Sequence, residues 1–423
     1  MTNLVVVGQG YVGLPMALRA AEAGLTVVGL DTDECLVANL NAGVSHIGDV
    51  SAEQLRAGLD GGFRAASDEQ CIEDADVVLV CVPTPLAEGG GPDLRAVERA
   101  GAAIGRRIRP GTLVVLESTT YPGTTEEVFA PLVLGDRWRL GADIHIAFSP
   151  ERIDPGNRAY RVQNTPKVVG GLTPACTRAA RDFYAGFVDT VVETKGAKEA
   201  EMAKVLENTF RHVNIALVNE MVRFCDELDI DLWDAIDAAA TKPFGYLPFR
   251  PGPGVGGHCI PIDPAYLSHR VRAKLGYAFR MVELAEEINS AAPLYVANRV
   301  LRALNEVKKP LMGATVLLLG VTYKPDVADC RQTPAIPLAE RLAAWGAHVS
   351  YHDPYVPTWS FRSNGSAASV TRVDDPHLAA GTADAVVLLQ PHAEYDLKRL
   401  SLTARLAIDT RGVMPLSTNV QRL

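Results

Sequence analysis

A glycine turn between two apolar runs, near the start of the chain, constrains the fold more than any other feature. Leu4–Val7 is a short apolar run, and the motif GQGYVG at residues 8–13 follows it directly. A helical pattern continues through residues 15–23, and Gly24 ends it. Thr26–Leu30 is a second apolar run. Strand, turn, helix and strand in this order predict a βαβ unit with parallel strands.

The spacing of this turn is that of a dinucleotide-binding site. Gly8 allows the tight turn, Gly10 lets a pyrophosphate approach the backbone, and Gly13 permits close packing of the helix on the strand. Tyr11 and Val12 lie where the helix starts. Because a helix N-terminus offers amide donors and a partial positive charge, we expect the phosphates to bind there.

Asp31 ends the second apolar run, close to the ~20-residue spacing expected after the glycines. Its carboxylate can accept hydrogen bonds from the ribose hydroxyls of adenosine. The next residues, Thr32 and Asp33, include no arginine for a 2′-phosphate, so the site predicts NAD and not NADP. The alternative is a glycine turn that binds no ligand, which the complete strand, turn and helix context disfavours.

The order of apolar runs along the chain predicts an α/β protein. Alternating strands and helices indicate parallel sheets covered on both faces. We therefore predict two Rossmann-like, doubly wound parallel-sheet domains joined by a long central helix and a helical middle domain. The predicted domains are residues 1–196, 197–308 and 309–423. The predicted strands and helices are Val77–Val82, Leu113–Glu117, His145–Phe148, a helix over Ala197–Leu228, a helical stretch over Pro264–Val307, Thr315–Leu319, a helix over Ala335–Trp345, His348–Tyr351, Ala385–Leu389 and Ala407–Asp409.

Composition excludes several broad classes. With 48% hydrophobic and 22% charged residues among 423, the chain is neither disordered nor fibrous. A net charge of −9 argues against nucleic acid or an anionic membrane as the main partner. No apolar run reaches the ~18 residues of a membrane span, and the N-terminus has no basic region typical of a signal peptide. We expect a cytoplasmic protein whose seven cysteines, which form no C-x-x-C pair, are reduced thiols.

The stretch GPGVGGHCIPID at residues 252–263 is rich in glycine and ends in a cysteine and a carboxylate. Glycines leave the backbone free to approach a ligand closely. A thiolate is a strong nucleophile that can attack an aldehyde, so Cys259 is a candidate nucleophile, with Asp263 four residues on. His258 could bind zinc or act as an acid or base; without a second Cys/His cluster we favour a structural role. The other cysteines fit ordinary core positions: Cys35, Cys71, Cys81, Cys176, Cys225 and Cys330.

The long central helix adds a polar pair. Lys204 and Asn208 are spaced i, i+4 and share a face of the helix. A lysine on a helix is usually a solvated charge, but this pair could instead present an ammonium and an amide to a ligand. Asn214 and Asn219 lie further along the same helix.

Seven segments in this order resemble the UDP-glucose/GDP-mannose dehydrogenase family over nearly the whole chain. That family oxidises C6 of a nucleotide-linked sugar to a carboxylate with two NAD per turnover. The segments are GQGYVGLP, VPTPL, STTYPGT, SPERIDPGN, EMAKVLENTFRHVNIALVNE, GPGVGGHCIPIDP and GVTYKPDVADCRQTP.

The resemblance implies a covalent mechanism. Cys259 would trap the aldehyde as a thiohemiacetal and then carry a thioester that water hydrolyses. Lys204 matches the lysine that stabilises developing oxyanions, and Asn208 matches its partner. Asp263 matches the carboxylate that supports the lysine and an ordered water. Two further positions match by the same motifs: Thr120, which holds a catalytic water, and Glu151, assigned to hydrolysis or base work.

The resemblance also implies that residues 1–196 bind NAD, residues 197–308 carry the dimer contact and catalytic groups, and residues 309–423 bind the UDP-sugar. Lys324 would lie near the nucleotide phosphates, Arg331 would reach the NAD site, and Arg250 would contact substrate phosphate. The implied NAD contacts outside the glycine turn and Asp31 are Pro83, Thr84, Thr120 and Arg331. The implied substrate contacts are Glu151, Arg152, Lys204, Asn208, Arg211, Arg250, Gly256, Tyr323 and Lys324.

The motifs FRHVNIALVNE and SPERIDPGN look most like the branch acting on UDP-N-acetylhexosamines, and Arg211 is its candidate marker. UDP-GlcNAc is the first expectation; UDP-ManNAc, UDP-GalNAc and UDP-glucose are the alternatives. His212, Cys330 and Gln332 depart from the residues common in this branch and leave fine specificity open. The family commonly forms homodimers through its central helix, so we expect a homodimer.

Two other functions remain as alternatives at this point. A two-electron dehydrogenase of the 6-phosphogluconate or hydroxyacid type also combines a Rossmann domain with a helical domain and a catalytic lysine, but it gives Cys259 no role. A non-catalytic NAD-binding protein would form no NADH with any UDP-sugar.

Overall fold

The computed structural model describes residues 2–48, 50–87, 91–154, 156–157, 159–257, 259–363 and 366–423. The chain forms two compact units. Unit 1 comprises Met1–Asn208 and Ile262–Tyr277, and unit 2 comprises Thr209–Pro261 and Ala278–Leu423. The division of function among residues 1–196, 197–308 and 309–423 stays a prediction.

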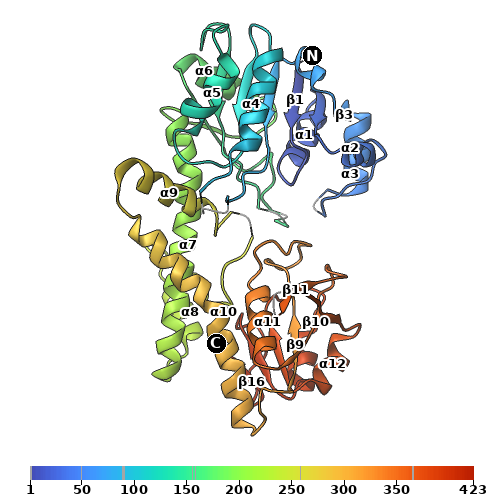
Figure 1. Ribbon diagram of the computed structural model, residues 1–423, viewed down its shortest axis with the longest axis vertical. Coiled ribbons are helices and arrows are strands. Elements are labelled where there is room, and N and C mark those ends of the chain that lie inside the picture. The colour runs from blue at the N-terminus through green and yellow to red at the C-terminus, as the bar shows by residue number, and fades with distance from the viewer. Residues whose placement is uncertain are drawn as a thin grey trace. The chain divides into compact units, whose positions relative to one another are not determined.

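Unit 1 is built on an eight-stranded sheet in the order β3-β2-β1-β4-β5-β6-β7-β8. Figure 1 labels β1 and β3 of this sheet. All neighbouring strands are parallel except β6 and β7, which pair antiparallel. The strands are β1 (Asn3–Val7), β2 (Thr26–Leu30), β3 (Phe63–Ala66), β4 (Val77–Val80), β5 (Leu113–Leu116), β6 (His145–Phe148), β7 (Lys167–Gly171) and β8 (Val191–Glu193).

Helices cover both faces of this sheet, because successive side chains of each buried strand point to opposite faces. Leu4 and Val6 of β1 join one buried apolar cluster, whereas Val5 joins the other. The helices of unit 1 are α1 (Gly13–Glu22), α2 (Glu34–Asn41), α3 (Ala52–Asp60), η1 (Glu69–Ile72), α4 (Arg95–Arg107), η2 (Thr125–Phe129), α5 (Ala130–Leu134), α6 (Pro174–Tyr184), the start of α7 (Ala197–Glu227) and α9 (Asp263–Leu275).

Unit 2 holds a six-stranded parallel sheet in the order β13-β10-β9-β14-β15-β16 and an antiparallel pair, β11 and β12. Its strands are β9 (Thr315–Leu319), β10 (His348–His352), β11 (Ser360–Ser363), β12 (Ser366–Ser369), β13 (Thr371–Arg372), β14 (Ala385–Leu388), β15 (Ala407–Asp409) and β16 (Val420–Arg422). Its helices are the rest of α7, α8 (Leu232–Ala240), α10 (Arg280–Glu306), α11 (Ala335–Ala344), α12 (Pro376–Thr382) and α13 (Leu397–Thr403).

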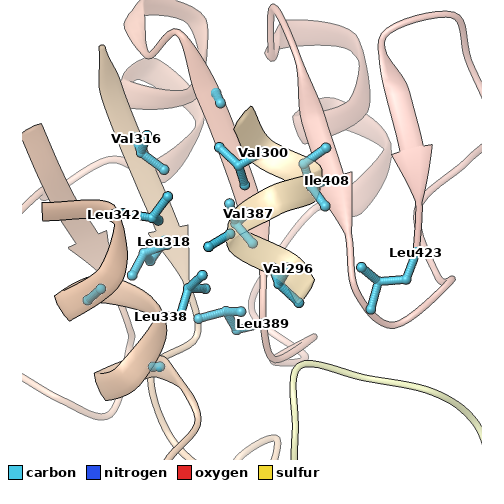
Figure 2. Close-up of a cluster of buried hydrophobic side chains, with 14 of the residues drawn as sticks. Val296, Val300, Val316, Leu318, Leu338, Leu342, Val387, Leu389, Ile408 and Leu423 are labelled. Atoms are coloured by element: carbon cyan, nitrogen blue, oxygen red, sulfur yellow. The ribbon is translucent and has the colours of Figure 1, made fainter. Parts of the chain in front are cut away.

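The main core of unit 2 forms where α10 and α11 pack on one face of its sheet. Figure 2 shows Val296 and Val300 of α10 and Leu338 of α11 beside Leu318 of β9 and Val387 of β14. A smaller buried cluster that includes Leu317, Leu319 and Leu400 covers the other face. Rossmann-like sheets at both ends of the chain, parallel apart from the β6–β7 pair, confirm the predicted fold class.

Two local expectations need correction. The helical stretch predicted over Pro264–Val307 is two helices, α9 and α10, because Gly276 takes a left-handed backbone conformation with φ +76° and ends α9. The second is the sheet of unit 1, which we expected to be parallel but in which β7 pairs antiparallel with β6.

All seven cysteines are free thiols. Within the described residues, no helix has the length and apolar character needed to span a membrane.

Candidate active site

The glycine turn after β1 is shaped by its own backbone. Gly8 has φ +90°, and a Cβ on it would lie 2.6 Å from the carbonyl oxygen of Cys81. A Cβ on Gly13 would lie only 1.8 Å from the carbonyl oxygen of Gly8. A Cβ on Gly10 would meet nothing within 4 Å, so the space beside this residue is open. Gly8 and Gly13 thus allow close packing within the turn, whereas the backbone at Gly10 stays open at the start of α1, as a bound pyrophosphate requires.

Asp31 follows β2 and completes this part of unit 1. Its Oδ2 accepts the backbone N–H of Gln9 at 2.8 Å, and its Oδ1 accepts that of Asp33 at 3.1 Å. The Asp31 side chain is only half-buried, so lone pairs remain for ribose hydroxyls. Asp33 in turn caps α2 by accepting the N–H of Leu36 at 3.0 Å. The carboxylates of Asp31 and Asp33 fit NAD and would repel a 2′-phosphate.

Two threonines lie at the ends of the neighbouring strands β4 and β5. Thr84 donates its hydroxyl to the carbonyl oxygen of Thr119 at 2.8 Å, and its own carbonyl accepts the hydroxyl of Tyr266 from α9. Thr120 is 1% exposed, and its Oγ1 has no hydrogen-bond partner among the residues that the structure describes. A buried hydroxyl left unsatisfied is costly, so this atom is suited to bind a water or a ligand.

Lys204 on α7 is withdrawn from solvent, with 6% of its surface exposed. Its Nζ donates to the backbone carbonyl of Glu151 and lies 3.6 Å from the Oε2 of the same residue. Glu151 follows β6 and is also 6% exposed. The Glu151 Oε1 accepts the backbone N–H of Ile153. Unit 1 thus places a buried ammonium beside a buried carboxylate.

Asn208 lies one turn after Lys204 on α7, and its Nδ2 donates to Oδ2 of Asp263. Asp263 is the first residue of α9. Both side chains are buried. Unit 1 therefore gathers four predicted catalytic side chains in two bonded pairs, Lys204 with Glu151 and Asn208 with Asp263.

Glu201, one turn before Lys204, was missed by sequence reasoning. Its buried carboxylate accepts the N–H of Gly123 at 2.5 Å and both the N–H and hydroxyl of Thr125, at 2.8 and 2.6 Å. Burial raises the pKa of Glu201, and these hydrogen bonds oppose the rise. The bonds tie the segment after Thr120 to α7. Its i, i+3 spacing from Lys204 is the one sequence signal that could have found it.

Arg152 lies outside the buried cluster of Lys204, Glu151, Asn208 and Asp263, and its side chain is partly exposed. Its Nη2 pairs with Oε1 of Glu207 at 2.7 Å, and its Nη1 donates to the carbonyl oxygen of Pro166 at 2.7 Å. The guanidinium thus links the segment after β6 to the segment that leads into β7.

Residues 252–261 of the glycine-rich stretch belong to unit 2, and they include Cys259, whose side chain is exposed. The N–H of Gly257 donates to the carbonyl oxygen of Arg331 at 3.0 Å. A Cβ on Gly256 would lie 2.8 Å from both Tyr323 Cβ and the Gln332 carbonyl oxygen. We expected these glycines to allow approach to a ligand; the structure shows that Gly256 and Gly257 allow approach to another part of the chain. His258 lies outside the described residues.

The remaining polar candidates of unit 2 take distinct positions. The Arg331 guanidinium donates three hydrogen bonds to Asp329: Nε to Oδ1 at 3.1 Å, Nε to Oδ2 at 2.9 Å and Nη2 to Oδ2 at 2.6 Å. Asn219 donates to Oδ1 of Asn289 at 3.0 Å and accepts the N–H of Gly252 at 2.9 Å, which holds the start of the glycine-rich stretch. Burial raises the pKa of the Cys330 thiol to about 12, so this cysteine is an inert thiol.

Arg250 and Arg211, two further predicted substrate contacts, are exposed. Arg250 pairs with Asp237 and lies 5.7 Å from the ring centre of Trp233. Arg211 lies on the outside of α7, whereas the neighbouring His212 is buried with its Nε2 3.5 Å from Oε2 of Glu286. Burial lowers the pKa of His212 to about 4, so its imidazole is neutral at pH 7.

Three family models match this chain in sequence. They describe the NAD binding domain of the UDP-glucose/GDP-mannose dehydrogenase family at residues 2–188, its central domain at 198–291 and its UDP binding domain at 317–415.

Similar proteins point the same way. The UDP-N-acetyl-D-glucosamine 6-dehydrogenase of Pseudomonas aeruginosa is 34% identical over 93% of this chain and 91% of its own length. The NDP-N-acetyl-D-galactosaminuronic acid dehydrogenase of Ralstonia nicotianae is 34% identical over 97% of this chain and 96% of its own length. The solved structure of the UDP-D-ManNAc dehydrogenase from Pyrococcus horikoshii matches with a TM-score of 0.88 and 30% identity, covering 100% of this chain and 99% of that one.

The glycine turn fits NAD, and family models match along most of the chain. The chain therefore belongs to the UDP-glucose/GDP-mannose dehydrogenase family and is an NAD-dependent nucleotide-sugar dehydrogenase.

Proposed function

We propose that this enzyme oxidises C6 of a UDP-N-acetylhexosamine, with UDP-GlcNAc the first candidate, to the uronic acid in a four-electron reaction with two NAD. Relatives named for N-acetylglucosamine, N-acetylgalactosaminuronic acid and N-acetylmannosamine chemistry support an N-acetyl sugar. Identities of 34% do not distinguish these sugars, so UDP-ManNAc, UDP-GalNAc and UDP-glucose are the alternatives.

The observation that carries the proposal is the buried polar cluster of unit 1. Lys204 holds a positive charge in a place where 6% of its surface meets solvent. A charge in such low-dielectric surroundings stabilises a negative oxygen far better than one in water does. We assign Lys204 to the oxygen that becomes negative at C6, Asn208 to a second hydrogen bond to that oxygen, and Asp263 to the orientation of Asn208.

Cys259 supplies the covalent step. NAD, when bound, supplies the hydride acceptor for the two oxidations. After the first, the Cys259 thiolate adds to the aldehyde carbon, and the carbonyl oxygen takes up a proton to give a thiohemiacetal. Oxidation of this adduct gives a thioester, and water then breaks the C–S bond, which releases the carboxylate and regenerates the thiol. The covalent bond keeps the aldehyde from escaping between the two oxidations.

Hydrolysis of the thioester needs a positioned water and a base. The Oγ1 of Thr120 lacks a hydrogen-bond partner in the described part of the chain and suits the water. Glu151 is the carboxylate we assign to proton removal, and its Oε2 lies 3.6 Å from Nζ of Lys204. For substrate binding we assign Tyr323 and Lys324 to the nucleotide part.

Counting NADH tests the mechanism. Purified enzyme is supplied in turn with UDP-GlcNAc, UDP-ManNAc, UDP-GalNAc, UDP-glucose and GDP-mannose, and NADH is measured per sugar consumed. The proposal expects two NADH per sugar, best with UDP-GlcNAc. Cys259→Ala should abolish uronic acid formation, Cys259→Ser should accumulate a covalent adduct, and Cys35→Ala, at another exposed cysteine, should retain activity. One NADH per sugar, or full activity in Cys259→Ala, would indicate a two-electron dehydrogenase.

We also propose a homodimer formed through α7. Within unit 2 this helix exposes apolar side chains at intervals of seven residues, namely Phe210, Leu217 and Phe224, each between 45% and 53% exposed. Such spacing places them along one helix face that a second helix could cover. Sedimentation of the wild-type chain should give a dimer mass, and Leu217→Lys with Phe224→Lys should give a monomer. A monomeric wild-type chain would refute this proposal without affecting the reaction.

A further inference from the structure

The carboxyl edge of the unit 2 sheet carries a buried acid–histidine pair outside the assigned catalytic groups. Strand β9 lies between β10 and β14, so the chain leaves β9 for one neighbour and returns later on the other side. In open α/β sheets such a switch point is where ligands bind, at the carboxyl ends of the strands. All three strands contribute to the pair or its contacts there: residues 320–322 after β9, Asp353 after β10 and His392 after β14.

Asp353 directs its carboxylate to the backbone that leaves β9. Its Oδ2 accepts the N–H of Val321 at 2.7 Å and that of Thr322 at 3.3 Å. Its Oδ1 accepts the N–H of Tyr355 at 2.9 Å. Asp353 is 0% exposed. Burial opposes its charge, but the hydrogen bonds from His392, Tyr355 and Val321 outweigh burial and hold the pKa of Asp353 below its usual value.

His392 connects Asp353 to the far end of the same loop. Its Nδ1 accepts the backbone N–H of Asp326 at 2.9 Å, so this nitrogen carries no proton. The proton is therefore on Nε2, which lies 3.0 Å from Oδ2 of Asp353 and donates to it. The imidazole is fully buried. One neutral histidine thus joins the acid after β10 to the end of the loop after β9.

The loop between these two anchors carries Tyr323 and Lys324. Its backbone is held along its length: Gln390 Nε2 donates to the carbonyl oxygen of Tyr323 at 2.8 Å, and Thr322 Oγ1 donates to that of Lys324 at 2.9 Å. Asp326 takes a left-handed conformation with φ +59°, which costs a non-glycine residue free energy. The surrounding hydrogen bonds therefore impose one loop conformation.

We propose that Asp353 and His392 are positioning residues for the nucleotide-sugar substrate: the pair fixes the backbone of residues 321–326 so that Tyr323 and Lys324 are held ready for the nucleotide. The pair itself touches no substrate. The proposal rests on the proposed function, because it takes Tyr323 and Lys324 as substrate contacts. Binding groups that are already held in place lose less conformational freedom when the ligand binds, so loosening this loop should weaken substrate binding.

Steady-state kinetics of His392→Ala test the proposal, with UDP-GlcNAc and NAD varied in turn. We expect the KM for UDP-GlcNAc to rise at least about tenfold, while the KM for NAD and the kcat at saturating sugar stay within about twofold. His392→Gln, whose amide can still donate to Asp353, should recover part of the loss. His348→Ala is the matched control, an exposed histidine at the opposite end of β10.

Further variants distinguish an error in the substrate assignment from an error in the positioning role of Asp353 and His392. Binding of UDP alone to Asp353→Asn, measured by calorimetry beside a melting curve, covers the case in which His392→Ala does not fold. If Tyr323→Ala and Lys324→Ala leave the KM for UDP-GlcNAc unchanged, the substrate assignment is wrong. If they raise it and His392→Ala does not, the positioning inference is overturned. It is also overturned if the KM for NAD rises equally, because general loss of structure would affect both substrates.

Discussion

The Rossmann-like sheets of the two units each have an acid at the same point of their topology, but the two acids have different roles. In unit 1, Asp31 follows β2 and accepts the N–H of Gln9, just after β1. In unit 2, Asp353 follows β10 and accepts the N–H of Val321, just after β9. Asp31 is half-buried, whereas Asp353 is 0% exposed and forms a hydrogen bond with His392.

This difference shows that burial, and not position in the fold, decides what such an acid can do. Asp31 keeps lone pairs open to solvent and can bind ribose hydroxyls. Asp353 is fully buried, and its carboxylate accepts three backbone N–H groups and one imidazole N–H. It is therefore not placed to reach a ribose, and what it holds is the loop after β9.

The turn after β1 depends on close backbone packing at its glycines, and Gly13→Ala should give the largest effect of the variants compared here. A Cβ at Gly13 would lie 1.8 Å from the carbonyl oxygen of Gly8, which is backbone and cannot move aside cheaply. We expect a loss of about 3 kcal/mol or more in the free energy of unfolding, measured with urea. Gly48→Ala, at an exposed glycine with nothing within 4 Å, should change it by less than about 0.5 kcal/mol. Equal stability of the two variants would contradict the account of the turn.

Unit 2 buries titratable groups beyond Asp353, and His212 should make its stability depend on pH. The pKa of His212 is lowered from its usual value of 6.5 to about 4 in the folded chain. Between these two pH values the imidazole is protonated in the unfolded chain but neutral in the folded chain. Stability should therefore fall as the pH drops from 6.5 toward 4, by about 2 kcal/mol between pH 7 and pH 5. The test is urea unfolding at both pH values.

His212→Asn should lose this part of the pH dependence. Burial also raises the pKa of Glu286, whose Oε2 lies 3.5 Å from Nε2 of His212, so Glu286→Gln is the control that must keep the His212 contribution. If wild type and His212→Asn lose equal stability on acidification, the lowered pKa is not the cause.

Gly10→Ala separates ligand binding from folding in unit 1. The added methyl group meets nothing within 4 Å in the protein but enters the space that we assign to the pyrophosphate. The KM for NAD should rise about tenfold, equivalent to about 1.4 kcal/mol, with unchanged unfolding free energy and unchanged KM for the nucleotide sugar. An unchanged KM for NAD would show that the pyrophosphate lies elsewhere.

Asp31→Asn should give the smallest effect. The amide oxygen can still accept the N–H of Gln9, but the charge is lost, so the KM for NAD should rise only a few-fold. The melting temperature should stay the same, because this side chain is half-buried. Asp353→Asn is the counterpart in unit 2 and should affect UDP binding instead. If both variants weakened NAD binding equally, the contrast between the two acids would fail.

Local features of this protein were predictable from sequence. The glycine turn, β6, β9 and β15 lie where the apolar runs and glycines predict them, and α7 ends within one residue of its expected end. These features depend on neighbouring residues, through the backbone conformation that glycine permits and the periodicity of apolar side chains.

Contacts between distant residues were not predictable. Tyr266 donates to Thr84, 182 residues away, and no motif marks either partner for the other. Glu201 reads as one more acid on a helix until it is seen to accept three hydrogen bonds from residues 123 and 125. The break at Gly276 was missed because apolar residues continue on both sides of it.

The sequence by itself determined the family, the NAD-binding turn and the α/β architecture, because each depends on short motifs or on the local periodicity of apolar residues. Only the tertiary structure decided which polar side chains lose contact with water. Asp31 and Asp353 both lie at the end of the second strand of a βαβ unit, and nothing in their immediate sequence separates a ligand-binding acid from a buried one. The separation comes from His392, 39 residues beyond Asp353, because burial is a property of what the rest of the chain packs against a residue.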